Sequence, residues 1–197
     1  EINDEFIKIA ADCEHLCPQF HPALQSGSDA VLKRMRRRYT TEQFLDTIHA
    51  MRERLDQPSF TTDVIVGFPG ETDTEFEQTV SLCRQVGFSK IHIFPFSPRA
   101  GTPAAELPDQ VPATIRKDRV HRLDSVQQQL ASQYYSRLIG HNLEVLIERS
   151  AKDRPGHVRG TDRRYVPVTL PGDTEEIGQL VEARAVSQDE TGVEGTR

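Results

Sequence analysis

Two short loops carry hydroxyl, amide and carboxylate groups directly after stretches that are predicted to be parallel strands. They are Gln25-Ser26-Gly27-Ser28 and Gly67-Phe68-Pro69-Gly70-Glu71. Ligands of parallel α/β folds bind beyond the carboxyl ends of the strands, where glycines let the backbone approach closely. Each loop also has a plain structural interpretation, as a helix cap or a tight turn. The residues nominated for ligand binding are Gln25, Ser26, Ser28, Gly67, Gly70 and Glu71.

Three further polar side chains lie within or just after predicted strands. Asp63 interrupts an apolar run, and because an unpaired buried carboxylate is costly, it requires a partner or a cavity. His92 alternates with isoleucines and either points into a barrel or is an ordinary core or surface histidine. Arg99 follows the third strand, where it either holds a carboxylate or phosphate or is simply exposed.

The three cysteines do not complete a recognisable metal site. Cys13 and Cys17 are spaced C-x3-C, but the next position of a C-x3-C-x2-C pattern is Phe20. Two thiolates cannot build an iron–sulfur site of that three-cysteine type. Cys83 lies on the apolar face of a predicted helix and is assigned to the core. No metal ligand is therefore predicted in this chain.

The elements that must position these residues alternate between strand and helix. Short strands are predicted at 20–25, 60–66 and 88–96, with helices over 29–38, from Thr40 to Pro58 and from Thr72 to Gly87. This order implies parallel strands joined by right-handed crossovers. Three such strands fit one edge of a larger, split barrel. A linking helix over 113–138 then closes a first domain over 1–138.

Short strand patterns dominate residues 139–197 and predict a small antiparallel β-barrel. Its candidate strands cover 143–147, 164–170 and 177–186, and the polar tail 187–197 is expected to fray. The whole chain has a net charge of −6, which disfavours a nucleic-acid partner. Residues 149–164 are nonetheless rich in positive charge. The candidate RNA-binding residues there are Arg149, Lys152, Arg154, Arg159, Arg163 and Arg164, and Arg99 is a further candidate for the substrate.

Composition sets the broad class of the protein. The 197 residues contain 36% hydrophobic and 27% charged residues, an ordinary balance for a folded protein. No apolar run is long enough for a membrane span, and no secretory signal is recognisable at the first residues. Few cysteines are typical of a reducing cytoplasm. The absence of an initiator methionine suggests a chain that begins inside a longer protein.

Several ordered motifs together give the sequence a resemblance to one enzyme family. They lie at 21–29, 31–40, 62–72 and 92–105, and the 139–186 region follows them. The first four resemble the fourth to sixth strands of radical S-adenosylmethionine (SAM) methylthiotransferases. Residues 139–186 are similar to the TRAM module, a small OB-like barrel that binds RNA. The resemblance implies an α/β fold: the C-terminal part of a parallel radical SAM (β/α) partial barrel, followed by the TRAM barrel.

The resemblance also implies a chemistry for the complete protein. SAM is cleaved at one 4Fe–4S cluster, a second 4Fe–4S cluster supplies sulfur, and an adenosine of tRNA beside the anticodon is methylthiolated. Near SAM the resemblance places the two loops and Asp63, and near its adenine Phe94 and Phe96. The three-cysteine loop is missing, so this chain alone is expected to hold no cluster and to be inactive. Its expected partners are tRNA and the missing N-terminal domains of the same protein.

Alternatives remain within and outside the family. The segment 94–99 and the basic run 33–39 look most like the branch that acts on threonylcarbamoyl-adenosine. The competing branches of the family are the one that acts on isopentenyl-adenosine in tRNA and the one that modifies a ribosomal protein. Outside this chemistry, the chain would be a stand-alone RNA-binding protein, or a different barrel enzyme that uses the 67–71 loop without any cluster.

Overall fold

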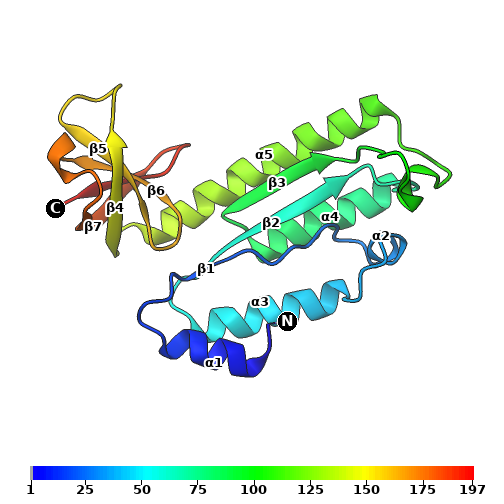
Figure 1. Cartoon of the computed structure of the whole chain (residues 1–197), viewed down its shortest axis with the longest axis horizontal. Helices are drawn as coiled ribbons and strands as arrows, with labels where there is room; N and C mark the ends of the chain where they lie inside the picture. The colour runs from blue at the N-terminus through cyan, green and yellow to red at the C-terminus, as the bar shows by residue number, and fades with distance from the viewer. Residues whose placement is uncertain (1) are drawn as a thin grey trace.

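The computed structural model describes residues 2–197, so Glu1 of the first predicted domain lies outside it. A layered α/β part and a small β-barrel are joined by one long helix (Figure 1). The first part contains α1 (Asp4–Asp12), β1 (Gln19–Phe20), α2 (Asp29–Arg34), α3 (Thr41–Arg54), β2 (Ser59–Val66), α4 (Asp73–Val86), β3 (Lys90–Pro95), η1 (Pro103–Ala105) and α5 (Ala113–Leu138). The second part contains β4 (Asn142–Ser150), β5 (His157–Asp162), β6 (Pro167–Pro171), η2 (Thr174–Glu176), β7 (Leu180–Gln188) and β8 (Val193–Thr196).

The first part is built on a three-stranded parallel sheet in the order β1-β2-β3. β1 forms only two pairs with β2, and an isolated bridge between Gln25 and Val64 continues the pairing further along. β2 and β3 pair in register from Thr61 with Lys90 to Val66 with Pro95. The predicted parallel α/β arrangement is therefore confirmed, with a β1 that is shorter than the predicted 20–25 strand.

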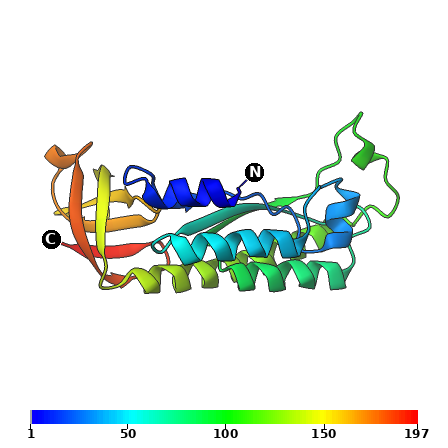
Figure 2. The same cartoon turned by 90° about the horizontal axis from the view of Figure 1, so that it is seen from below.

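Helices cover one face of this sheet and leave much of the other face open. Figure 2 shows α3, α4 and α5 together on one side of the strands, with α1 on the opposite side. Along β2 the burial alternates, so that Phe60 and Val64 pack under the helices while Thr61 and Asp63 are only half-buried on the open face. Phe94, which the family resemblance places near adenine, lies on the open face and is 50% exposed.

The helix boundaries follow the capping signals in the sequence. Thr40 and Thr72 form the two predicted capping boxes, and α4 ends at Gly87, whose φ of 62° is left-handed. The helix predicted over 29–38 is wrong in length, because Arg36 adopts a φ of 58° and ends α2 early. Helix α1 has no counterpart among the predicted elements. None of the helices in residues 2–197 is both long enough and apolar enough to cross a membrane.

The second part is a closed barrel with strand order β4-β5-β6-β8-β7. The prediction of a small barrel is confirmed, but the barrel is mixed rather than antiparallel because β8 runs parallel to β6. The prediction of a frayed tail is wrong, because β8 fills the gap between β6 and β7. Val193 is buried there, and the Gly195 backbone packs against Ala183 and Val168.

Helix α5 contributes to both hydrophobic cores. Leu123, Val126 and Leu130 pack in the core under the parallel sheet. One and two turns further along, Tyr134 and Leu138 belong to the barrel core. The two cores are therefore connected through a single continuous helix, which matches its predicted range of 113–138.

Candidate functional site

The Gly67–Glu71 loop lies at the carboxyl end of β2 and is held by a buried carboxylate. Gly67 and Gly70 both have a φ of 72°, a left-handed conformation that favours glycine. One carboxylate oxygen of Glu71 accepts a hydrogen bond from the Gly67 N–H at 2.6 Å and a bond from Arg119 at 2.7 Å. Glu71 was predicted to line the ligand pocket, yet its side chain is only 1% exposed. Its main action is therefore to fix the loop.

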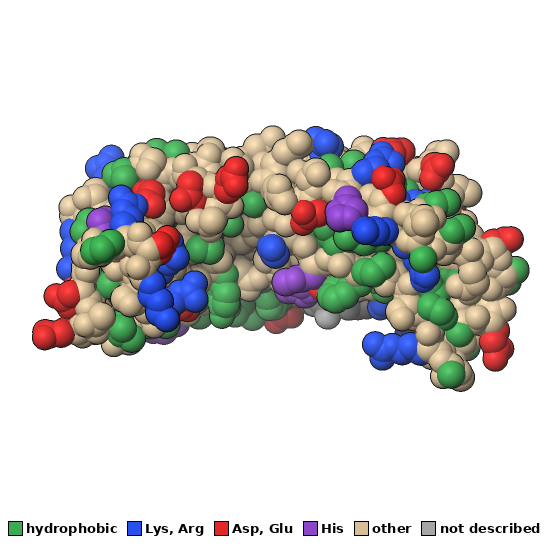
Figure 3. Space-filling view, turned by 90° about the horizontal axis from the view of Figure 1, so that it is seen from above, with side chains coloured by type: hydrophobic (Ala, Val, Ile, Leu, Met, Phe, Trp, Pro, Cys, Tyr) green, Lys and Arg blue, Asp and Glu red, His purple; other side chains and the backbone are tan. Residues whose placement is uncertain are grey.

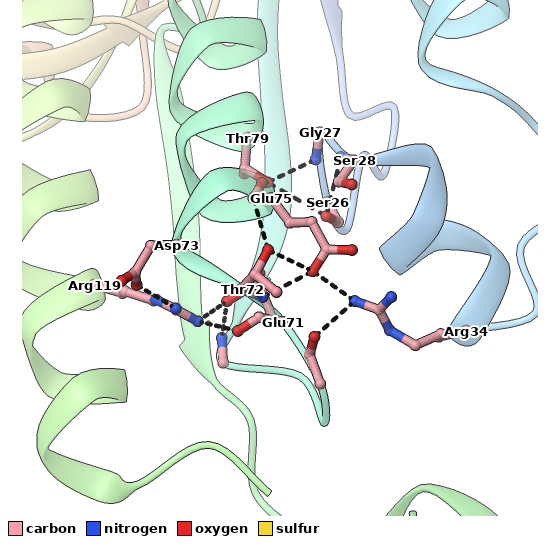
Figure 4. A network of polar contacts seen from close by, with 12 residues as sticks. Ser26, Gly27, Ser28, Arg34, Glu71, Thr72, Asp73, Glu75, Thr79 and Arg119 are labelled. Atoms are coloured by element: carbon pink, nitrogen blue, oxygen red, sulfur yellow. Dashed lines mark hydrogen bonds and ion pairs between the residues drawn. The ribbon is translucent and has the colours of Figure 1, made fainter. Parts of the chain in front are cut away.

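Arg119 is a site residue that the sequence did not reveal. It comes from α5, its side chain is 4% exposed, and its second terminal nitrogen pairs with Asp73 at 2.7 Å (Figure 4). Its guanidinium also lies over the ring of Phe76, 5.4 Å from the ring centre. Burial raises the pKa of Glu71, although the Gly67 N–H and the Arg119 charge oppose this effect. The other carboxylate oxygen of Glu71 is buried without a hydrogen-bond partner among the described residues.

The Gln25–Ser28 loop is attached to α4 through hydroxyl groups. Ser26 Oγ lies 3.3 Å from the hydroxyl of Thr79, and the Gly27 N–H donates to that same hydroxyl at 3.0 Å. The Ser28 N–H donates to Ser26 Oγ at 3.2 Å. Ser28 occupies the N-cap position of α2, but its side chain makes no capping hydrogen bond. Ser26 therefore stabilises the loop itself.

Gln25 bridges this loop to β2 through its backbone. Its φ is 64°, its N–H donates to the Asp63 carbonyl at 2.8 Å, and its carbonyl accepts from the Ile65 N–H at 2.9 Å. The backbone of Gln25 thus continues the sheet where β1 has ended. Its side chain is buried.

Arg34 ties α2, the helix that follows the Gln25–Ser28 loop, to the Gly67–Glu71 loop. Its guanidinium donates to the Gly70 carbonyl at 3.2 Å and pairs with Glu75 at 2.8 Å (Figure 4). Burial acts to raise the pKa of Glu75, but the bonds from Arg34 and from Thr72 hold that pKa below its usual value. The structure therefore brings the two loops together as one braced unit, as their positions after adjacent strands predicted.

A cavity of about 380 Å³ lies beside this unit. Arg36, Arg37, Ile65 and Phe68 line it together with Leu107 and other residues of the long loop after β3. Phe68, which the sequence did not nominate, contacts the edge of Phe96 with ring centres 5.2 Å apart. Phe96 is thus half-buried at the base of this loop, whereas Arg99 is exposed further along it. The cavity is therefore lined both by apolar side chains and by arginines.

The Asp63 side chain lies on the open face of the sheet, although its backbone carbonyl accepts the hydrogen bond from the Gln25 N–H. The Asp63 side chain is 36% exposed, so it is not the buried carboxylate that the apolar run predicted; His21 is its partner, with the imidazole Nε2 3.4 Å from Oδ1. His92 is its direct cross-strand neighbour and is exposed on the same face. His21 was not nominated from the sequence.

Two of the six basic residues predicted to bind RNA make contacts between the barrel and the α/β part. Arg163 donates to the carbonyls of Glu14 and Leu16, and Arg164 donates to the Gln57 carbonyl at 3.2 Å and pairs with Asp56 at 3.0 Å. These contacts fasten the barrel to the α/β part.

The remaining four basic residues differ in how they are paired. Arg154 pairs with Glu194, and Arg159 pairs with Asp153 at 2.7 Å. Arg149 and Lys152 are exposed and have no ion-pair partner in residues 2–197. Figure 3 shows basic side chains over the barrel end interspersed with acidic ones. The positive surface is therefore smaller than the sequence predicted.

Comparison of the sequence with known protein families indicates the superfamily to which the α/β part is similar. Residues 1–83 match the sequence profile of the Radical SAM superfamily. That segment ends in α4 and includes both braced loops. A parallel sheet followed by a small barrel is consistent with that match.

Similar proteins include two kinds of tRNA methylthiotransferase. The chain is 42% identical over 182 residues to the tRNA-2-methylthio-N(6)-dimethylallyladenosine synthase of Desulfitobacterium hafniense, covering 92% of this chain and 41% of that protein. It is 39% identical over 186 residues to the threonylcarbamoyladenosine tRNA methylthiotransferase MtaB of Bacillus subtilis, covering 93% of this chain and 41% of that protein. The chain thus spans about two fifths of the length of these relatives. Because the two identities are nearly equal, they do not separate the two named substrates.

Proposed function

We propose that this chain is the C-terminal portion of a radical SAM enzyme that methylthiolates an adenosine of tRNA. The observation that carries the proposal is the match over more than nine tenths of the chain to two kinds of tRNA methylthiotransferase. The braced loops at the carboxyl ends of the strands support it, because this is where parallel folds bind their cofactors. The protein would act in the cytoplasm, where tRNA is available.

SAM would bind beside the braced loops, and the chain's own residues fit this role. Gly67 and Gly70 keep the backbone free of side chains at the strand end, and the Glu71–Arg119 pair holds that backbone in place. The exposed ring of Phe94 offers a flat apolar surface for adenine. In this proposal Glu71 is a positioning residue that acts through the Gly67 N–H, and Ser26 positions the neighbouring loop. Bound SAM would supply the radical and the methyl group.

The described cysteines do not fit a radical SAM cluster. Cys13 and Cys17 are exposed, whereas Cys83 is fully buried and its burial raises the thiol pKa to about 12. A thiol with such a pKa stays protonated at neutral pH, and a cluster ligand must be a thiolate. Both clusters would therefore be held by parts of the protein other than this chain.

The substrate proposed for the full-length enzyme is threonylcarbamoyl-adenosine. This modification carries a carboxylate, whereas a dimethylallyl group is purely apolar. The cavity beside the loops has arginine walls from Arg36 and Arg37, and Arg99 is exposed on the loop that borders it. Arginine recognises carboxylates through paired hydrogen bonds, so the charge of this region favours the acidic modification.

A chimaera tests the activity and the substrate together. The matching region of the Bacillus subtilis enzyme would be replaced by this chain and expressed in cells that lack their own methylthiotransferases. Mass spectrometry of tRNA nucleosides is expected to detect methylthiolated threonylcarbamoyl-adenosine. Methylthiolated dimethylallyl-adenosine instead would refute the substrate proposal. No methylthiolation from a folded, cluster-loaded chimaera, beside an active unswapped enzyme, would refute the activity.

RNA contact is proposed for the free basic residues of the barrel. Arg149 and Lys152 are expected to lie near phosphates, because both are exposed and neither has an ion-pair partner within residues 2–197. Replacing both by alanine should weaken tRNA binding and reduce its salt dependence, by roughly 0.7–0.9 in the log–log slope per lost phosphate contact. Arg154→Ala is the matched control and should have a smaller effect, since Glu194 already pairs with Arg154. Equal effects in a filter-binding titration would contradict this assignment.

A further inference from the structure

Three potential metal ligands meet on the open face of the parallel sheet. His21 directly follows β1, Asp63 lies in the middle of β2, and His92 lies on β3. Asp63 and His92 are partners in the β2–β3 register. Adjacent strands are only about 4.8 Å apart, so side chains on the same face at one level of the sheet come close together. The fold therefore gathers two imidazoles and one carboxylate from three separate segments.

The distances among these groups suit a small metal ion. One ligand atom from each of the three residues lies within 4.8 Å of the other two. His21 Nε2 and Asp63 Oδ1 are 3.4 Å apart. A tetrahedral ion with bonds of about 2.0–2.1 Å requires ligand atoms about 3.3 Å from one another. One edge of the tetrahedron is thus already at its expected length, and a bound ion would draw in the His92 imidazole, whose ligand atom lies within 4.8 Å of the other two.

A second layer of polar groups orients His21. Its Nδ1 lies 2.8 Å from the hydroxyl oxygen of Thr61, and that oxygen also accepts a hydrogen bond from the Gln19 side chain at 2.9 Å. When Nδ1–H donates to Thr61, the lone pair of Nε2 is directed toward Asp63. This is the arrangement by which proteins prepare a histidine for metal binding, because the outer hydrogen bond fixes both the tautomer and the ring orientation.

The site is accessible and would remain open on one side. The side chains of His21 and Asp63 are 40% and 36% exposed, and His92 is exposed as well. Three protein ligands leave a fourth position for water or a small ligand, as in catalytic rather than structural metal sites. Two imidazole nitrogens with one carboxylate oxygen form a donor set that suits divalent first-row transition metals.

We propose that His21, Asp63 and His92 form a binding site for a divalent transition-metal ion such as Zn²⁺, with Thr61 as a positioning residue. This site lies on the open face of the sheet and uses neither the side chains of the braced loops nor the cysteines. The proposal does not rest on the proposed function, because it concerns side chains that the 197-residue chain itself contains.

Titration of the purified, chelator-treated chain with Zn²⁺ alone, and separately with Co²⁺ alone, tests the site. The background is the C13S/C17S variant, which removes the exposed thiols as competing ligands. We expect one bound ion per chain by calorimetry, and Co²⁺ should give visible absorption bands of a tetrahedral complex without a thiolate band. His21→Asn, Asp63→Asn and His92→Asn should each lower the affinity at least tenfold.

Two further variants separate specific binding from general effects. Thr61→Val should lower the affinity by roughly 10–100-fold, as is usual for loss of an outer-layer partner. His49→Asn is the matched control, because His49 is an exposed histidine on α3, outside the proposed site. The metal affinity of this variant should be unchanged. The proposal is overturned if the C13S/C17S background binds no ion, or if ligand substitutions that keep the native circular dichroism spectrum leave the affinity unaltered.

Discussion

Removal of the Arg119 side chain is expected to destabilise the protein strongly and in a pH-dependent way. Arg119 and Glu71 have side chains that are 4% and 1% exposed, so Arg119→Met would leave a buried carboxylate without its countercharge. Breaking a buried ion pair in this manner typically costs about 3–5 kcal/mol. The bond from Arg119 to Asp73 adds little, because the Asp73 side chain is 89% exposed.

The pH dependence follows from the direction in which the pKa of Glu71 is shifted in the folded protein. Burial raises this pKa in the folded protein above its ordinary value of 4.5. The folded state therefore binds the proton more tightly than the unfolded state, so the contribution of Glu71 to stability is full below that ordinary value. It is lost as the pH rises through the folded-state pKa. Without Arg119 that pKa rises further, so the deficit of the variant relative to wild type should grow as the pH increases.

Urea denaturation of the two proteins at about pH 5 and about pH 8 measures this effect. Glu71→Gln combined with Arg119→Met is the matched control, since it keeps an oxygen acceptor for the Gly67 N–H but removes the charge. The double variant should recover part of the lost stability and lose the extra pH dependence. Equal stability of wild type and Arg119→Met at both pH values would refute the reasoning.

Three further predictions concern other contacts. Arg164→Ala removes the bond to the Gln57 carbonyl and the pairing with Asp56, two of the contacts between the barrel and the α/β part, so the midpoint of thermal unfolding should fall; an unchanged calorimetric midpoint would contradict this. Gly27→Ala places a methyl group 2.6 Å from a backbone carbon of α4 and should cost roughly 1–3 kcal/mol by urea denaturation, whereas an unchanged midpoint would show that the loop can move. Iodoacetamide should label Cys13 and Cys17 but spare the buried Cys83, as peptide mass spectrometry can establish; equal labelling would mean that the core opens readily.

The sequence predicted the elements that carry a local signal. Thr40 and Thr72 mark helix starts through capping boxes, and the β-branched run before Gly67 marks a buried strand, so α3, α4 and β2 follow directly. β5 and β8 escaped prediction because they are polar or glycine-rich and gain their stability from neighbours on both sides in a closed barrel. Intrinsic strand preference says little about such segments.

The sequence predicted where the two loops lie, but not the contacts that hold them; that they bind a ligand stays a prediction. Positions after parallel strands were sufficient to nominate the two loops. The roles of Glu71 and Ser26 within them depend on Arg119 and Thr79, which come from helices and share no local motif with the loops. His21 lies 42 residues before Asp63, and only the sheet register brings them together. A pairing of this kind has no signature in spacing.

Because α5 belongs to both cores, its length fixes the distance and the orientation between the barrel and the α/β part. Its 26 residues span about 39 Å, and each residue added within it would advance the barrel by about 1.5 Å and turn it by about 100°. The contacts from Arg163 and Arg164 to the first part accept only one such setting. The distance and the angle between the barrel surface and the carboxyl-end loops consequently depend on the length of α5, and adding or removing one residue within it would change both.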